Sequence, residues 1–173
     1  MLWMPQLMRR FKIFTLNQRV IAAAVFALFS LVSINANAES VAGQGKCTFK
    51  PTASYVANTD GYAVMLSETT CTSSGGFIEG AAVSNPEIAN LHQGIGDNSG
   101  YYTITNGTDS TIAKWIGKVT TVMKDGSPMT SSKGQWEYVG GTGKYKDIKG
   151  KGEFNSYFTS ATEYTVDWKG KKD

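Results

Sequence analysis

Residues 135–154 read Gln-Trp-Glu-Tyr-Val-Gly-Gly-Thr-Gly-Lys-Tyr-Lys-Asp-Ile-Lys-Gly-Lys-Gly-Glu-Phe, and this stretch carries the strongest fold signal in the chain. Two runs that alternate between apolar and polar residues are joined by a glycine-rich connection. The five glycines are Gly140, Gly141, Gly143, Gly150 and Gly152. Glycine at this density next to strand-like sequence is typical of bent or bulged strands. The stretch therefore predicts strongly curved strands in a small closed sheet.

The first 38 residues have the organisation of an export signal. Four basic residues precede the apolar run 20–34, and Ala36-Asn37-Ala38 places small residues where a signal peptidase reads them. The apolar run is shorter than the roughly 20 residues of a bilayer-spanning helix. We therefore predict cleavage of a 1–38 signal peptide after Ala38, with no stable membrane insertion afterwards. Residues 39–173 are predicted to be a single domain, periplasmic or secreted.

Removal of the leader changes the charge of the chain. The leader holds four of the 17 basic residues and none of the 14 acidic ones, so the domain carries 17 − 4 = 13 basic side chains against 14 acidic ones, a net charge of −1. The domain also lacks arginine, the residue that reads phosphates and guanine edges with paired hydrogen bonds. We therefore expect no nucleic-acid partner. Its 173 − 38 = 135 residues suit one hydrophobic core.

Eight segments of the domain are rich in β-branched and aromatic residues and are separated by turn residues. They span residues 46–56, 61–72, 76–84, 100–106, 111–124, 133–139, 150–158 and 162–169. The dipeptides Asp60-Gly61, Asn106-Gly107 and Asp125-Gly126 tolerate positive φ and predict hairpin turns between these segments. This pattern predicts an all-β fold, a small antiparallel barrel of about eight strands, with a sandwich as the alternative.

Residues 85–93 are the one segment that we predict to be helical. Asn85 can cap a helix, and Pro86 suits the first position of one. One or two helical turns here would close an end of the barrel.

Period-two alternation indicates which side chains face the interior. Trp136 and Tyr138 share one face of their segment, and Glu137 lies on the other. The same alternation in the other segments gives five inward aromatic residues as candidate ligand contacts: Trp115, Trp136, Tyr138, Tyr164 and Trp168. Such rings can line an open cavity or fill a packed core, and the sequence alone does not distinguish these two states of the interior.

Cys47 and Cys71 are the only cysteines of the chain. Eleven residues separate Cys47 from Asn58 and ten separate Gly61 from Cys71, so a hairpin turning at Asn58 to Gly61 brings the two cysteines nearly opposite each other. In an exported chain this arrangement predicts a structural disulfide.

The search for catalytic and metal-binding motifs is negative. His92 is the only histidine, which excludes a multi-histidine metal site, and Tyr145 stands where a phosphate-binding loop after Gly143-Lys144 needs Ser or Thr. We predict no catalytic residue, no metal and no cofactor. Tyr138, Tyr164 and Ser156 are the polar groups among the inward residues that a catalytic function would have to use.

The block Trp136-x-Tyr138-x-Gly140-Gly141-Thr142-Gly143-Lys144-Tyr145-Lys146-x-Ile148-x-Gly150-x-Gly152 resembles a segment of small exported bacterial proteins of the allene oxide cyclase barrel-like group. Plant dirigent proteins carry a related Gly-Gly-Thr-Gly-Lys stretch. The resemblance implies a calycin- or dirigent-like antiparallel barrel with an apolar cavity, often in a homo-oligomer. No catalytic residue of the plant enzymes aligns with this chain, so none is carried over.

Three functions fit these observations. The first is an exported barrel that binds an apolar small molecule in its interior without catalysis. The second is a dirigent- or cyclase-like isomerase acting on a hydrophobic substrate, and the third is a structural or interaction module with a filled core. The volume of the interior and the presence of an inward carboxylate discriminate among them.

Overall fold

The computed structural model describes residues 38–56, 60–74 and 80–173. The predicted leader before Ala38 lies outside the described residues, as does Asn58 of the first hairpin turn. Cleavage of the leader therefore stays a prediction. Within the described residues, no helix is long and apolar enough to cross a membrane.

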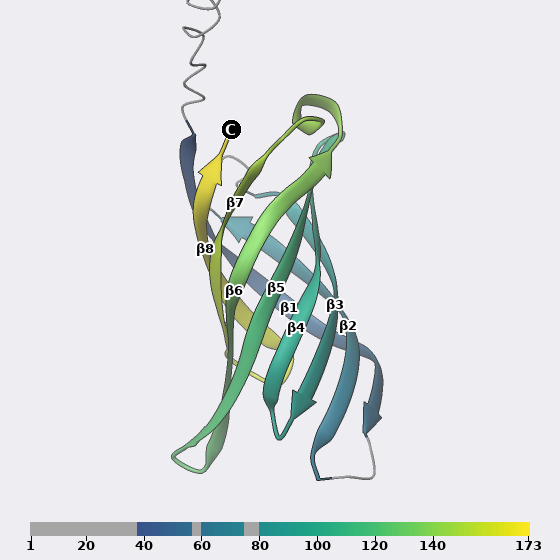
Figure 1. The fold of residues 1–173 in the computed structure, drawn as a ribbon, viewed down its shortest axis with the longest axis vertical. Coiled ribbons are helices and arrows are strands. Elements are labelled where there is room, and N and C mark those ends of the chain that lie inside the picture. The colour runs from purple at the N-terminus through teal and green to yellow at the C-terminus, as the bar shows by residue number, and fades with distance from the viewer. Residues whose placement is uncertain (1–37, 57–59, 75–79) are drawn as a thin grey trace, which may run out of the picture. The chain divides into compact units, whose positions relative to one another are not determined.

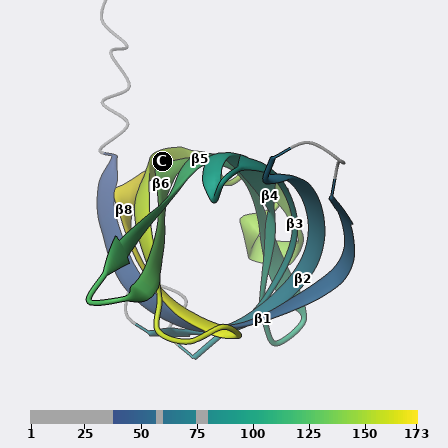
Figure 2. The same cartoon turned by 90° about the horizontal axis from the view of Figure 1, so that it is seen from below.

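Eight antiparallel strands form one sheet that closes into a barrel (Figures 1 and 2). They are β1 (Glu39–Val56), β2 (Tyr62–Ser74), β3 (Ala82–His92), β4 (Ile95–Asn106), β5 (Asp109–Lys124), β6 (Ser127–Gly141), β7 (Gly150–Phe158) and β8 (Glu163–Lys172). Each strand pairs with its neighbour in sequence, and pairing of β1 with β8 closes the ring. The predicted barrel is thus confirmed, and the sandwich alternative is wrong.

The predicted helix at 85–93 is wrong, because these residues belong to strand β3 and the turn that follows it. β3 pairs with β2 on one side and with β4 on the other. A two-residue turn at Gln93-Gly94, with φ of 52° and 76°, reverses the chain into β4. Positive φ at both central residues matches the twist of a hairpin, so this turn favours strand pairing over a helix.

Pro86 is accommodated inside the sheet by a local gap in pairing. The ladder between β3 and β4 passes from the pair Ser84–Thr103 to the pair Glu87–Gly100 and omits Asn85 and Pro86. Proline has no N–H to donate to a ladder, so a gap here is the expected accommodation. The local features that suggested a helix start are therefore compatible with a strand.

The glycine-rich stretch produces a bulge and a closing turn at the upper end of the barrel in Figure 1. The register between β5 and β6 shifts so that Val139 is an extra residue in β6. The 3₁₀ turn η2 (Gly143–Tyr145) follows and buries Tyr145 against Ala81. Gly143 has a φ of 54°, a conformation that favours glycine, and a Cβ there would lie 1.9 Å from Asp109 Oδ1 unless that side chain moved.

Cys47 and Cys71 form the predicted disulfide and lie directly opposite each other in the β1–β2 ladder. The register shifts between Pro51 and Ala53, which leaves Thr52 as an extra residue in β1. Thr52 accounts for the one-residue difference between the two arms of the hairpin. Its Oγ1 donates a hydrogen bond to the carbonyl oxygen of Leu66 at 3.2 Å.

Candidate functional site

Side chains from the strands divide the barrel interior into two chambers along its axis. Tyr102 and Phe154 line both chambers and form the partition between them. The volumes are about 60 Å³ toward the upper end of Figure 1 and about 70 Å³ toward the lower end. Since one water molecule needs about 10–15 Å³ on this measure, each chamber holds a guest of roughly five heavy atoms. Pockets for drug-sized ligands are larger, about 300–1,000 Å³.

The upper chamber, called here the apolar chamber, has walls of aromatic and aliphatic side chains that include Trp136, Tyr138 and Trp168. The ring centroid of Trp136 lies 5.1 Å from that of Tyr138 and 6.1 Å from that of Trp168, both edge to face. Trp136 Nε1 donates to the Glu153 carbonyl oxygen at 3.2 Å. Burial, with a contribution from Tyr145, raises the pKa of Tyr138 to about 12, so its hydroxyl stays protonated near neutral pH.

The lower chamber, called here the carboxyl chamber, contains an inward carboxyl group, that of Glu87 on β3. Asn98 Nδ2 donates to Glu87 Oε1 at 3.0 Å, and Asn98 Oδ1 accepts from Ser132 Oγ at 3.0 Å. Gly117 makes room for this relay, because a Cβ there would lie 2.6 Å from Asn98 Oδ1. Burial raises the pKa of Glu87, and the hydrogen bond from Asn98 opposes the shift in part.

Trp115 is held in the carboxyl chamber by a buried amide. Its Nε1 donates to Asn85 Oδ1 at 2.8 Å, and the Asn85 side chain is fully buried. The side chains of Asn85 and of Thr69, its partner residue on β2, also hydrogen-bond the hydroxyl of Tyr164, and both bonds oppose the rise in the Tyr164 pKa that burial causes.

Two tyrosines complete the polar surroundings of Glu87. Burial, with a smaller contribution from the charge of Glu87, raises the pKa of Tyr164 to about 12. Burial likewise raises the pKa of Tyr102 well above its ordinary value, and Tyr164 and Glu87 act in the same direction. Both hydroxyls therefore stay neutral near physiological pH and neutralise no charge on Glu87.

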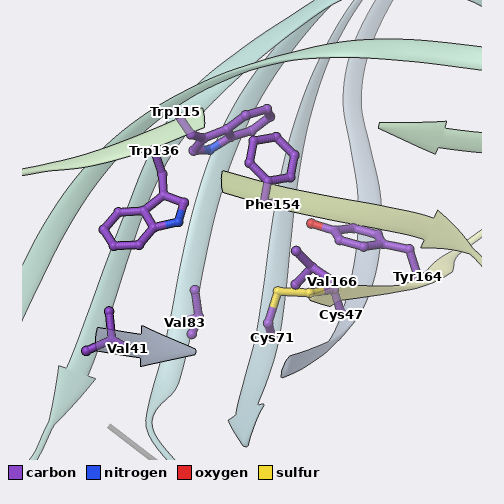
Figure 3. Close-up of a cluster of buried hydrophobic side chains, with 9 residues drawn as sticks. All are labelled: Val41, Cys47, Cys71, Val83, Trp115, Trp136, Phe154, Tyr164 and Val166. Carbon is purple, nitrogen blue, oxygen red and sulfur yellow. A yellow bond between two sulfur atoms is a disulfide. The ribbon is translucent and has the colours of Figure 1, made fainter. Parts of the chain in front are cut away.

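All five aromatic residues singled out in the sequence face the interior, but the structure separates them into two groups. Trp136, Tyr138 and Trp168 line the apolar chamber, whereas Trp115 and Tyr164 line the carboxyl chamber. Figure 3 shows Trp115, Trp136 and Tyr164 in one buried cluster with the disulfide. Their roles as ligand contacts stay predictions.

The other residues considered for chemistry have structural surroundings. Ser156 Oγ donates to the Ser132 carbonyl oxygen at 3.4 Å, which ties it to the neighbouring strand. His92 is exposed and stacks on Tyr62 with 4.1 Å between ring centroids. No group of three or more metal-binding side chains occurs in the described part of the chain.

Glu87 is the functional candidate that the sequence reasoning missed. The helix predicted at 85–93 concealed the alternation of Val83, Asn85, Glu87, Ala89 and Leu91, which all face inward on β3. Treating this segment as a strand would have placed a carboxyl group among the inner aromatic rings.

Comparisons with known proteins bear on the fold alone. No family model and no curated protein matches the chain. Among solved structures, the chain is similar to the crystal structure of a protein with unknown function from the DUF3224 family of Shewanella oneidensis MR-1, with a TM-score of 0.52. The identity is 13%, and the match covers 77% of this chain and 96% of that chain. At this identity the likeness concerns the barrel architecture and carries no activity with it.

Proposed function

We propose that this chain is an exported barrel that binds a small apolar molecule in the apolar chamber without converting it. The observation that carries the proposal is an internal space of about 60 Å³ lined by the rings of Trp136, Tyr138 and Trp168 together with aliphatic side chains. Walls of this kind suit an apolar or planar guest, because they offer dispersion contacts and few hydrogen-bonding groups.

The polar groups that line the apolar chamber favour binding over catalysis. Among the described lining residues they are the hydroxyls of Ser73, Tyr102 and Tyr138. The raised pKa of each tyrosine keeps its hydroxyl protonated, so neither acts as a general base near neutral pH. The acidic group of the interior, Glu87, lines the other chamber. This separation supports a binding role over an isomerase.

Export and family relationship are parts of the same proposal. The Cys47–Cys71 disulfide is consistent with an oxidising compartment, and the leader ending at Ala38 supplies a route to the periplasm or medium. The closed eight-stranded barrel and the bulged glycine block at 139–143 support a relationship to the allene oxide cyclase barrel-like group.

Benzene, an apolar planar molecule with one heavy atom more than the roughly five that the chamber volume accommodates, tests the proposal. Ala113 lines the apolar chamber and Ala89 lines the carboxyl chamber, and both are buried. Ala113→Val adds two methyl groups to the proposed site, and Ala89→Val adds the same two elsewhere in the interior. We expect benzene to raise the melting temperature of the parent and of Ala89→Val in a saturable way, and to have little effect on Ala113→Val.

Two results would count against this function. Equal stabilisation of both variants would place benzene outside the apolar chamber. A folded parent that responds to none of a series of small apolar compounds would favour the structural module with a filled core.

A further inference from the structure

Glu87 faces the carboxyl chamber without a cationic side chain opposite it. Residues from every strand line this chamber, and apart from Glu87 its titratable groups among the described residues are Tyr102 and Tyr164. Lysines of strand β5, which contributes Trp115 and Val119 to the chamber, point away from it: Lys114 pairs with Glu137, and Lys118 pairs with Asp97, on the outer surface. Within the described lining, the acid is therefore not neutralised by the protein itself.

An uncompensated carboxylate in this position is costly to the fold. Transfer of an ionised carboxyl group from water to a low-dielectric interior is strongly unfavourable unless a countercharge accompanies it. Burial raises the pKa of Glu87 for this reason. The neutral groups around it, including Asn98 Nδ2, supply hydrogen bonding but no positive charge. A cation that entered the chamber would supply it.

Aromatic rings form much of the chamber wall. Trp115 lies 5.8 Å from Tyr102 and 5.4 Å from Phe154 between ring centroids. On the far side, Phe158 lies 5.5 Å from Phe49 and 5.3 Å from Tyr164. These six rings come from five strands. The faces of Trp, Tyr and Phe attract organic cations, and such rings around one acid are complementary to an ammonium group.

The ligand atoms of the chamber argue against a metal ion. Calcium takes six to eight oxygen ligands, and magnesium requires a near-octahedral set. Glu87 is the carboxylate among the described lining residues, and the described chain has no cluster of three or more His, Cys, Asp or Glu side chains. A volume of about 70 Å³ accommodates an ion of roughly five heavy atoms.

We propose that the carboxyl chamber binds a small organic ammonium ion, with Glu87 as its counter-ion and the aromatic rings as its walls. Half-buried Phe49, Met65 and Leu91 also line this chamber. The site is separate from the apolar chamber, so the inference does not depend on the function proposed above.

The test compares tetramethylammonium chloride with tert-butanol, a neutral molecule with the same number of heavy atoms, at constant ionic strength set with sodium chloride. The indole N–H signal of Trp115 in a ¹H–¹⁵N spectrum reports on the carboxyl chamber. Parent protein is compared with Glu87→Gln, which keeps the shape and removes the charge. Asp97→Asn, at the acid on the outer face of β4, is the matched control.

We expect tetramethylammonium to shift the Trp115 signal saturably in the parent and in Asp97→Asn, and its affinity to fall at least tenfold in Glu87→Gln. Affinity in the parent should increase as pH rises and Glu87 ionises, and should stay flat in Glu87→Gln, since Tyr102 and Tyr164 remain neutral. Equal affinity of the parent and Glu87→Gln would overturn the inference. So would an absence of saturable binding to the folded parent at alkaline pH, or binding of tert-butanol as tightly as the ion.

Discussion

Loss of the Cys47–Cys71 disulfide is expected to destabilise the barrel by an amount that follows from its position. The two cysteines are 24 residues apart, and closing a loop of this size removes denatured-state entropy worth about 3.5 kcal/mol. Both sulfur atoms are also buried in the core cluster. Replacing both cysteines by alanine therefore adds roughly 1.5 kcal/mol for lost packing. For a domain of about 135 residues, the crosslink alone corresponds to about 12 °C in melting temperature.

Urea unfolding of three samples separates these two contributions. The oxidised parent, the parent reduced with a thiol, and Cys47→Ala/Cys71→Ala are compared under identical conditions. Reduction removes the crosslink and keeps the sulfur atoms, so we expect a loss of about 3.5 kcal/mol on reduction and about 5 kcal/mol in the double variant. A reduced parent within about 1 kcal/mol of the oxidised one would refute the loop-closure reasoning.

Three further predictions concern the interior and the leader. Burial raises the pKa of Glu87, so the folded state holds this proton more tightly than the unfolded state, and the stability present at acid pH is lost as pH rises through the folded-state pKa. Glu87→Gln should gain stability relative to the parent as the pH rises above the ordinary carboxyl pKa in urea unfolding, and a pH-independent difference would contradict this. Trp136→Ala should cost about 3–5 kcal/mol in the same assay, because the indole is buried and packs against Tyr138 and Trp168; a loss under about 1 kcal/mol would mean that the ring is not packed as described. Intact mass of protein recovered from the periplasm or medium should correspond to a chain that starts at Glu39, and retention of residues 20–34 would contradict export by cleavage.

The sequence predicted the strands of the barrel correctly where the alternation of apolar and polar residues agrees with the turn residues that flank it. β7 occupies 150–158 as predicted, and Asp125-Gly126 joins β5 to β6 with positive φ at both residues. It was insufficient at β3, where capping signals at Asn85 and Pro86 compete with pairing to two neighbouring strands. The hydrogen bonds that pair β3 with β2 and with β4 join residues far apart in the sequence, so a short segment considered by itself does not predict them.

The sequence predicted which side chains of the candidate site point into the barrel, but not how the interior is divided into chambers. Alternation placed Trp115 and Trp136 inside correctly, yet it could not show that they serve different chambers. That division depends on the barrel bringing Tyr102 of β4 and Phe154 of β7 into contact with both spaces. The stagger between strands that sets such cross-barrel neighbours is a property of the closed sheet as a whole. Glu87 was missed for a local reason, the mistaken helix.

The central claim, a guest in the apolar chamber, is tested most directly by the indole N–H signals of the barrel tryptophans during a benzene titration. Trp136 and Trp168 line the apolar chamber and Trp115 lines the other, so the three signals report on the two spaces separately. We predict saturable shifts of Trp136 and Trp168 that fit one Kd, a smaller change at Trp115, and no saturable shift in Ala113→Val. No saturable change at Trp136 or Trp168 up to the solubility limit of benzene would contradict the account.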